Sequence, residues 1–181
     1  MDGIILAGGK STRMNQYKLL LLYKGKPILF YAIEGMKDFV DNLYVVTGHY
    51  DKEIREALKD LDVQIITNKD YEKGMFSSVK KGVEHVGSDF FLLPGDCPFI
   101  KKETYKALLN GSGKIRVPSY KNEDGHPIFI SFEYKDEILK MPLDSNLKIF
   151  RDSKNYEIIN VEDEFITTNL NTFLDVEKIK L

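Results

Sequence analysis

A short segment near the N-terminus combines glycines with cationic and hydroxyl side chains. Gly8-Gly9-Lys10-Ser11-Thr12-Arg13 follows an apolar run, and Lys18 stands a few residues further on. Glycines let backbone N–H groups approach a ligand, and successive N–H groups form a concavity that binds anions. Lysine adds positive charge, and arginine can bind phosphate through two hydrogen bonds. The segment predicts a polyphosphate site; a glycine-rich turn without a ligand is the alternative interpretation.

Two familiar phosphate loops do not fit this segment. A P-loop needs a glycine, four further residues and then Gly-Lys-Ser/Thr. Gly9-Lys10-Ser11 matches the end of that pattern, but Ile4 occupies the upstream position that requires glycine. The Gly-x-Gly-x-x-Gly spacing of a dinucleotide fingerprint is also absent. The segment is therefore predicted to bind phosphate in some other way.

The second segment that could carry chemistry is centred on Asp96. Pro94, Gly95 and Pro98 flank this aspartate and predict a stiff loop after an apolar strand. Mg²⁺ commonly takes one or two protein carboxylates together with waters and substrate phosphates. Asp96 is therefore the predicted metal ligand; the alternative is an aspartate that caps the helix expected after it. Its neighbour Cys97 is interpreted as a small buried residue.

Further polar residues follow other predicted strands. Ser77 and Ser78 begin a predicted helix, where hydroxyls can meet a base or a phosphate or simply cap the helix. His126 precedes a proline and could contact an anionic substrate, or it could be an ordinary turn residue. The amide oxygens of Asn169 and Asn171 could face the metal, although amides are weaker ligands than Asp96.

Strands and helices alternate through the first two thirds of the chain. Alternation of this kind predicts βαβ units and a mostly parallel sheet covered on both faces. Ligands of such sheets bind beyond the carboxyl ends of the strands, so the polar segments above should converge. Strands are predicted at 4–7, 43–47, 63–67, 89–93 and 114–117, and helices at 27–37, 51–59, 75–86 and 101–109.

The rhythm changes after Pro118. Residues 120–125 form a predicted polar turn, and 126–132 alternate like a strand that is antiparallel and at an edge of the sheet. Two short helices, a strand at 157–161 and a closing helix at 172–180 follow. Nothing separates a second unit, so residues 1–181 are expected to form one domain.

Composition excludes several classes of protein. The 181 residues contain 26 Lys+Arg and 28 Asp+Glu, so a general nucleic-acid binder, which usually has a basic excess, is not expected. The single cysteine cannot form an intrachain disulfide. The N-terminus does not resemble a signal peptide, and no apolar run approaches the roughly 20 residues that cross a bilayer. A cytoplasmic protein without a membrane partner is predicted.

The motifs together resemble the nucleotidyltransferases related to molybdenum cofactor nucleotidyltransferases, the MobA-like NTP transferases. The resemblance is carried by Leu6-Ala7-Gly8-Gly9-x-Ser11-x-Arg13-Met14 with Lys18-Leu19-Leu20, and it spans about residues 4–175. Gly74-Met75-x-Ser77-Ser78-Val79, Gly95-Asp96-x-Pro98 and Gly125-His126-Pro127 look most like the molybdopterin cytidylyltransferase branch. The resemblance implies a Rossmann-like three-layer α/β/α fold.

It also implies Mg²⁺-dependent transfer of NMP from an NTP to a phosphorylated acceptor, with release of pyrophosphate. The acceptor would be molybdopterin or molybdenum cofactor, and a molybdoenzyme or a chaperone would receive the product. Arg13, Lys18 and Asp96 would be catalytic, His126 would lie near the acceptor, and Asp96, with Asn169 or Asn171, would hold the metal. The nucleotide would be bound by Leu6, Ala7, Gly8, Gly9, Lys10, Ser11, Arg13, Lys18, Asn68, Ser77 and Ser78.

Two departures leave the base open. The cytidylyltransferase branch usually has Leu-Ala-Ala-Gly, whereas Gly8 stands here as in the guanylyltransferase branch. Asn169-x-Asn171-Thr172 likewise leans toward the guanylyltransferases. CTP is favoured by the middle of the chain and GTP by its ends. A sugar-phosphate or other small-phosphate nucleotidyltransferase and a nucleotide-binding regulator without catalysis are the alternatives.

Overall fold

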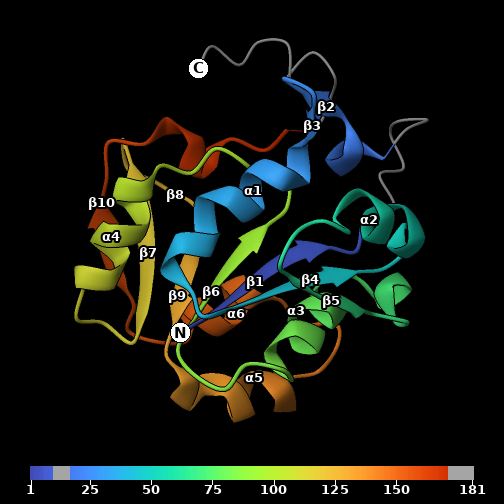
Figure 1. Cartoon of the computed structure of the whole chain (residues 1–181). Helices are drawn as coiled ribbons and strands as arrows, with labels where there is room; N and C mark the ends of the chain where they lie inside the picture. The colour runs from blue at the N-terminus through green and yellow to red at the C-terminus, as the bar shows by residue number, and fades with distance from the viewer. Residues whose placement is uncertain (10–16, 171–181) are drawn as a thin grey trace.

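The protein is described by a computed structural model that covers residues 1–9 and 17–170. Its main sheet has the strand order β10-β7-β9-β6-β1-β4-β5 (Figure 1). The parallel centre consists of β1 (Asp2–Ala7), β4 (Asn42–Thr47), β5 (Gln64–Thr67) and β6 (Phe90–Pro94). All six residues of β1 are buried, as expected for a strand covered on both faces.

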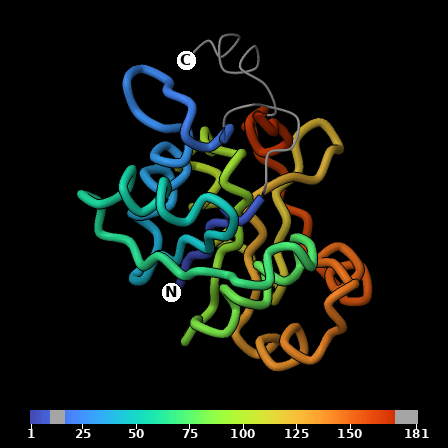
Figure 2. The backbone as a smooth tube through the Cα atoms, turned by 90° about the vertical axis from the view of Figure 1, so that its right-hand side faces the viewer, coloured from blue at the N-terminus to red at the C-terminus, as the bar shows by residue number. Residues whose placement is uncertain are grey.

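Helices cover both faces of this sheet, so the predicted three-layer α/β/α fold is confirmed (Figures 1 and 2). One face packs against α1 (Ile28–Met36), α2 (Asp51–Ala57) and α4 (Lys102–Asn110). The other packs against α3 (Met75–Val83), α5 (Lys135–Lys140) and α6 (Leu147–Asp152). Side chains alternate along β1 accordingly: Ile5 joins the first core and Ile4 the second.

The first of these helices forms where the apolar spacing predicts it. Pro27, the predicted first residue, stands at the N-cap, and α1 begins one position later at Ile28. The apolar residues recur every three or four positions and therefore line one face. All five residues of this face are buried: Ile28, Leu29, Ala32, Ile33 and Met36.

The late strand is antiparallel as predicted, but its predicted position at an edge is wrong. It is β9 (Ile128–Ile130), and it lies between β6 and β7 (Ile115–Tyr120), antiparallel to both. All three residues of β9 are apolar and buried, which suits an interior strand. The edge on this side is instead β10 (Glu157–Asn160), which runs parallel to β7.

The predicted polar turn at 120–125 contains one more short strand, β8 (Glu123–Asp124), which pairs with β7. Lys121 and Asn122 make this turn with positive φ angles of 51° and 67°. A separate two-stranded hairpin consists of β2 (Leu22–Tyr23) and β3 (Lys26–Pro27). Short 3₁₀ turns are η1 (Lys18–Leu20), η2 (Lys37–Phe39), η3 (Tyr71–Lys73), η4 (Phe132–Tyr134) and η5 (Glu164–Thr167).

The predicted closing helix at 172–180 lies outside the described residues. In residues 1–9 and 17–170, helices of the length and apolarity that a bilayer crossing requires are not found.

Candidate functional site

Three parallel strands end side by side, and a glycine follows each of them. These are Gly8 after β1, Gly48 after β4 and Gly95 after β6. A Cβ atom on Gly48 would lie 2.6 Å from the backbone oxygen of Gly8, and one on Gly95 would lie 3.0 Å from that of Leu6. The missing side chains therefore let the three strand ends pack backbone to backbone. Gly48 was not predicted, although its place directly after a strand was the available signal.

Asp96 and Lys18 form an ion pair at this edge. The Lys18 ammonium, at the start of η1, lies 2.5 Å from Asp96 Oδ2. Both side chains are about one fifth exposed, at 23% and 19%. The backbone N–H of Gly95 donates to the Leu6 oxygen at 2.9 Å, which ties the Asp96 loop to the end of β1. A cation of the first segment and the predicted metal ligand are thus neighbours.

Helix capping does not account for Asp96. Helix α4 begins after its N-cap residue Lys101, and the side chain that meets its start is the buried Asp163, whose Oδ2 accepts from the Lys101 backbone N–H at 2.8 Å and from the Thr104 hydroxyl at 2.7 Å. The capping alternative is therefore wrong. Asp96 is left on a loop whose carboxylate meets Lys18.

Asn169 is held beside Asp96 although the two are distant in sequence. The next backbone N–H, of Leu170, donates to the Asp96 carbonyl at 3.0 Å. The Asn169 Oδ1 accepts from Cys97 Sγ at 3.1 Å. Cys97 is buried as predicted, and burial, followed by the negative charge of Asp96, raises the pKa of its thiol. Asn171, the other predicted amide ligand, lies outside the described residues.

The chemistry of these two oxygen donors suits a hard divalent cation. Asp96 offers a carboxylate, which already forms an ion pair with the Lys18 ammonium, and Asn169 offers an amide oxygen. Across residues 1–9 and 17–170, three or more His, Cys, Asp or Glu side chains do not gather into a metal-binding group. Mg²⁺ at Asp96 would therefore complete its shell with water and substrate phosphate, as it commonly does.

Asn68, Ser77 and Ser78 form a buried polar cluster behind Gly8. The Asn68 Nδ2 donates to both serine hydroxyls, each at 2.9 Å. A Cβ atom on Gly8 would lie 2.7 Å from Ser78 Oγ. Helix α3 has Gly74 as its N-cap and no side-chain cap, so the serines serve the cluster and do not make an N-cap. The cluster therefore packs directly against Gly8 and leaves no room for a side chain there.

His126 lies at the same edge because β9 runs antiparallel to β6. The pairing of Leu92 with Ile128 brings the residues just before β9 alongside the end of β6. The His126 N–H donates to the Ile166 oxygen at 2.8 Å, but its buried Nδ1 has no hydrogen-bond partner in the part of the chain that the structure describes. Burial lowers the pKa of His126 to about 4; Asp96 opposes this shift and Arg151 adds to it. The imidazole is therefore neutral at pH 7.

Some of the other predicted site residues lie within the described part of the chain, and some lie outside it. Leu6 and Ala7 end β1 and are buried, and Gly9 is exposed. Lys10, Ser11 and Arg13 lie outside the described residues.

A tyrosine that the sequence did not single out supports the end of β1. The Tyr17 hydroxyl donates to the Ala7 oxygen at 2.6 Å, and its ring stacks on Tyr50 with centroids 4.2 Å apart. Burial, then the charge of Asp96, raises the pKa of Tyr17, so the phenol stays a donor. No pattern in the sequence distinguished this tyrosine from the others.

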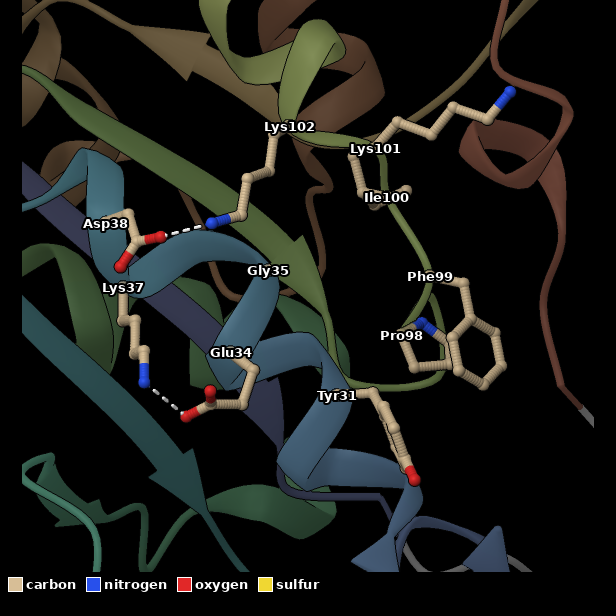
Figure 3. A pocket seen from close by; sticks show the side chains of 10 residues that line it. All are labelled: Tyr31, Glu34, Gly35, Lys37, Asp38, Pro98, Phe99, Ile100, Lys101 and Lys102. Atoms are coloured by element: carbon tan, nitrogen blue, oxygen red, sulfur yellow. Dashed lines mark hydrogen bonds and ion pairs between the residues drawn. The ribbon is translucent and has the colours of Figure 1, made fainter. Parts of the chain in front are cut away.

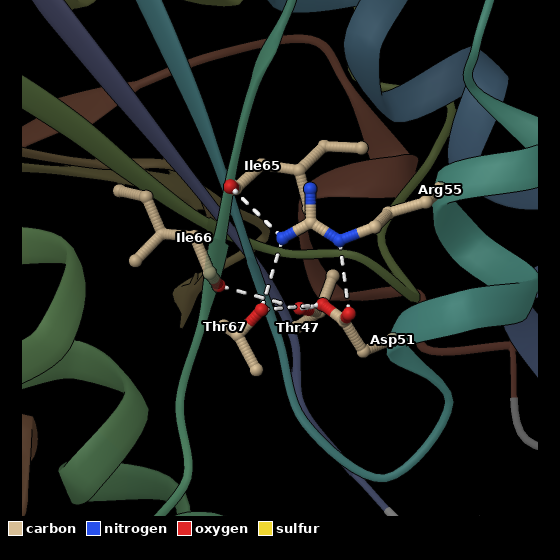
Figure 4. Close-up of polar contacts among 6 residues, drawn as sticks. All are labelled: Thr47, Asp51, Arg55, Ile65, Ile66 and Thr67. Carbon is tan, nitrogen blue, oxygen red and sulfur yellow. Dashed lines mark hydrogen bonds and ion pairs between the residues drawn. The ribbon is translucent and has the colours of Figure 1, made fainter.

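A polar network joins the ends of β4 and β5 to α2 (Figure 4). Asp51 Oδ1 accepts from the hydroxyls of Thr47 and Thr67, and its Oδ2 accepts from Arg55 Nε at 2.9 Å. Arg55 also donates to Thr67 Oγ1 at 2.9 Å. Burial would raise the pKa of Asp51, but the hydrogen bonds from Arg55, Thr47 and Thr67 outweigh it and lower the pKa. The network fixes the ends of β4 and β5, which directly precede Gly48 and Asn68.

An open groove of about 630 Å³ lies between α1 and the segment that follows Asp96 (Figure 3). Ion pairs join Lys102 to Asp38 at 2.5 Å and Lys37 to Glu34 at 2.7 Å along it. Sequence reasoning did not predict this groove. Its lining consists of Tyr31, Glu34, Gly35, Lys37, Asp38, Pro98, Phe99, Ile100, Lys101 and Lys102.

Comparison with known proteins identifies the family of this chain. A family model described as a MobA-like NTP transferase domain matches residues 3–157. The chain belongs to this family. Among curated relatives, the MobA-like chain is 31% identical to the molybdenum cofactor cytidylyltransferase of Escherichia coli, over 92% of this chain and 94% of the relative. It is 26% identical to a protein of Natranaerobius thermophilus named "Probable molybdenum cofactor guanylyltransferase", over 99% and 95% of the two chains.

Solved structures show the same fold for this MobA-like chain. A Mycobacterium tuberculosis protein, solved as a complex with manganese, superposes with a TM-score of 0.82 at 19% identity and covers 98% of both chains. The chain is therefore a nucleotidyltransferase of the MobA-like family with a mostly parallel, Rossmann-like sheet.

Proposed function

We propose that the protein transfers NMP from CTP or GTP to a phosphorylated, molybdopterin-like acceptor in a Mg²⁺-dependent reaction. An acceptor phosphate oxygen forms a bond to the α-phosphorus, and the bond between the α-phosphorus and the bridging oxygen breaks as pyrophosphate leaves. A phosphate acceptor is already anionic, so this step needs no strong general base. The observation that carries the proposal is the Lys18–Asp96 ion pair, which brings a cation of the first segment to the proposed metal ligand.

Separate residues of the chain stabilise the leaving group and hold the metal. Lys18, with Arg13 and the backbone N–H groups of Gly8 and Gly9, stabilises the negative charge of the departing pyrophosphate. Asp96 holds the Mg²⁺, with Asn169 or Asn171 as an amide ligand. The bound metal supplies charge neutralisation between the nucleotide and the acceptor.

Four further residues bind the substrates without taking protons. The neutral His126 contacts the acceptor through Nδ1, which has no hydrogen-bond partner within residues 1–9 and 17–170, and we assign it no general-base role. Asn68, with Ser77 and Ser78, supports the ribose and base.

The base preference follows two opposed observations. Similarity to the Escherichia coli cytidylyltransferase favours CTP. Gly8, whose missing Cβ leaves Ser78 Oγ in place, keeps the feature typical of guanylyltransferases and favours GTP. In a thermal-shift panel with CTP, GTP, UTP and ATP in the presence of Mg²⁺, CTP or GTP should give the largest rise in Tm. The nucleotide that does so is the preferred substrate.

Pyrophosphate release tests the reaction itself. With Mg²⁺, the preferred NTP and molybdenum cofactor, the wild-type protein should release pyrophosphate. Asp96→Ala should slow turnover by about 10²- to 10³-fold, as loss of a transition-state contact does. Lys18→Ala should raise KM for the nucleotide as well. Lys114→Ala is the matched control, because Lys114 forms an exposed ion pair with Glu133 on another part of the surface.

Three outcomes would contradict the proposed assignments. Near-normal turnover in Asp96→Ala would remove the metal assignment, and an unchanged KM in Lys18→Ala would remove Lys18 from the site. Nucleotide binding without pyrophosphate release from the wild-type protein would favour a regulator over an enzyme.

A further inference from the structure

Cys97 lies directly after Asp96 with its thiol turned toward an amide. Its Sγ donates to Asn169 Oδ1 at 3.1 Å and lies 4.0 Å from Asp96 Oδ1. Cys97 is 1% exposed, whereas Asn169 is exposed at the surface of the site. The thiol carries one donor hydrogen, and it is used on the amide oxygen.

The orientation of this amide matters for a cation. A carboxylate only accepts hydrogen bonds, so a carboxamide beside Asp96 would by itself tend to turn its N–H₂ group toward the carboxylate. Turned that way, Asn169 would present donors, and not an oxygen, to a metal on Asp96. The Cys97 donor favours the opposite orientation, with Oδ1 on the side of the Asp96–Cys97 segment.

The backbone position of Asn169 does not depend on this thiol. The Leu170 N–H donates to the Asp96 carbonyl at 3.0 Å. The Leu170 side chain is 3% exposed and packs with Leu21 and Ile28. These contacts place the backbone of the segment, whereas the thiol contact acts on the rotation of the amide.

We propose that Cys97 is a positioning residue that turns the Asn169 amide oxygen toward a divalent cation held by Asp96. The inference rests on the proposed function, because it takes Asp96 as the metal ligand. It adds a role for the one cysteine of the chain that no part of the transfer chemistry uses. Residues that orient metal ligands commonly change metal affinity about 10- to 100-fold when they are lost.

The test is a Mn²⁺ titration of the full chain, with the metal alone, followed by electron paramagnetic resonance of free Mn²⁺. Cys97→Ala and Cys97→Ser remove the sulfur and leave side chains of similar size, but only serine keeps a donor. Cys97→Ala should weaken Mn²⁺ binding about 10-fold, the low end for a positioning residue because a thiol is a weak donor. Cys97→Ser should bind more tightly than Cys97→Ala and approach the wild-type affinity.

A second background separates positioning from packing. In Asn169→Ala, the alanine and serine variants of Cys97 should bind Mn²⁺ equally, because the amide through which the donor acts is gone. The isosteric pair Cys97→Val and Cys97→Thr repeats the comparison at larger volume if the smaller variants fail to fold.

The proposal is overturned if Cys97→Ala and Cys97→Ser weaken Mn²⁺ binding equally when Asn169 is intact. It is also overturned if the two variants still differ in Mn²⁺ affinity in the Asn169→Ala background. Asp96→Ala distinguishes the two levels of failure. If Asp96→Ala loses Mn²⁺ binding while the alanine and serine variants are equal, the metal assignment stands and only the role of Cys97 fails. If Asp96→Ala binds Mn²⁺ like the wild type, the metal assignment of the proposed function fails as well.

Discussion

The Ser78 hydroxyl occupies the space where a side chain at position 8 would begin. It cannot turn away without a cost, because its Oγ accepts from Asn68 Nδ2 at 2.9 Å in a buried cluster. Gly8→Ala, which places Cβ 2.7 Å from Ser78 Oγ, should therefore lower the free energy of unfolding by about 1–3 kcal/mol. Urea denaturation measures the loss.

A second substitution tests the cause. In Ser78→Ala the hydroxyl is gone, and the nearest remaining atoms, the Thr47 backbone oxygen and Cβ of residue 78, lie 3.6 and 3.7 Å from the new methyl group. The double variant should be more stable than the sum of the two single losses predicts, by about 1 kcal/mol. Gly9→Ala is the control, since a Cβ there meets no atom of the described residues within 4 Å, and it should change stability by about 0.5 kcal/mol at most. Strict additivity would mean that Ser78 does not restrict position 8.

His126 should make stability depend on pH in a defined window. Burial, opposed by Asp96 and reinforced by Arg151, lowers its pKa from 6.5 to about 4. Between these values the unfolded chain binds more protons than the folded one, so the stabilising contribution is full above pH 6.5 and is lost as the pH falls toward 4.

Between pH 7 and pH 4.5 the wild type should therefore lose more unfolding free energy than His126→Gln, because glutamine cannot titrate. Urea denaturation at both pH values gives the difference. Parallel pH dependence of the two proteins would show that His126 is not buried in its neutral form.

At the scale of elements, the sequence predicted the strands that carry the site but not what fixes their ends. The apolar runs at 43–47 and 63–67 identify β4 and β5, because buried parallel strands have continuous apolar residues. Thr47 and Thr67 end those runs and were predicted only as the last residues of the two strands. Their partner Asp51 lies on α2, so the network depends on how the helix packs, and no local pattern predicts that.

This network should be a main support of the strand ends. Asp51→Ala removes the acceptor of two threonine hydroxyls, of which Thr47 is fully buried, and the partner of Arg55. We expect a loss of about 1–3 kcal/mol in unfolding free energy, the usual result when a buried donor loses its acceptor.

Glu53→Ala is the matched control, because Glu53 is exposed in the same first turn of α2 and shares its favourable position near the helix N-terminus. It should cost about 0.5 kcal/mol or less. Equal losses in the two variants would show that the network contributes no more than helix electrostatics.

At the scale of the whole molecule, the alternating pattern predicted the fold class, and the family resemblance predicted the three layers. The order of strands could not be read in the same way. Ile128-Phe129-Ile130 is too short for its periodicity to distinguish an edge strand from an interior one, and Pro127 before it suits either the start of a strand or an edge. Partners on both sides, β6 and β7, are chosen by packing across the sheet.

Gly125 joins that interior strand to the rest of the molecule, and one substitution there should disturb both fold and site. A Cβ atom at this position would overlap the backbone oxygen of Ile166 in η5 and lie 2.6 Å from its carbonyl carbon. Backbone cannot move aside as a flexible side chain can, so Gly125→Ala should lower the unfolding free energy by about 3 kcal/mol, the upper end for an overpacked site.

Because the adjacent His126 N–H donates to that same Ile166 oxygen at 2.8 Å, the displacement should also move the imidazole away from Asp96. In the proposed reaction this appears as a higher KM for the acceptor with an unchanged KM for the nucleotide. Gly87→Ala provides the control for glycine replacement in general, because a Cβ there meets nothing within 4 Å in the part of the chain that the structure describes. If Gly125→Ala is as stable as Gly87→Ala and keeps its acceptor KM, then η5 is not tightly packed against the start of β9, and His126 is held by its own strand alone.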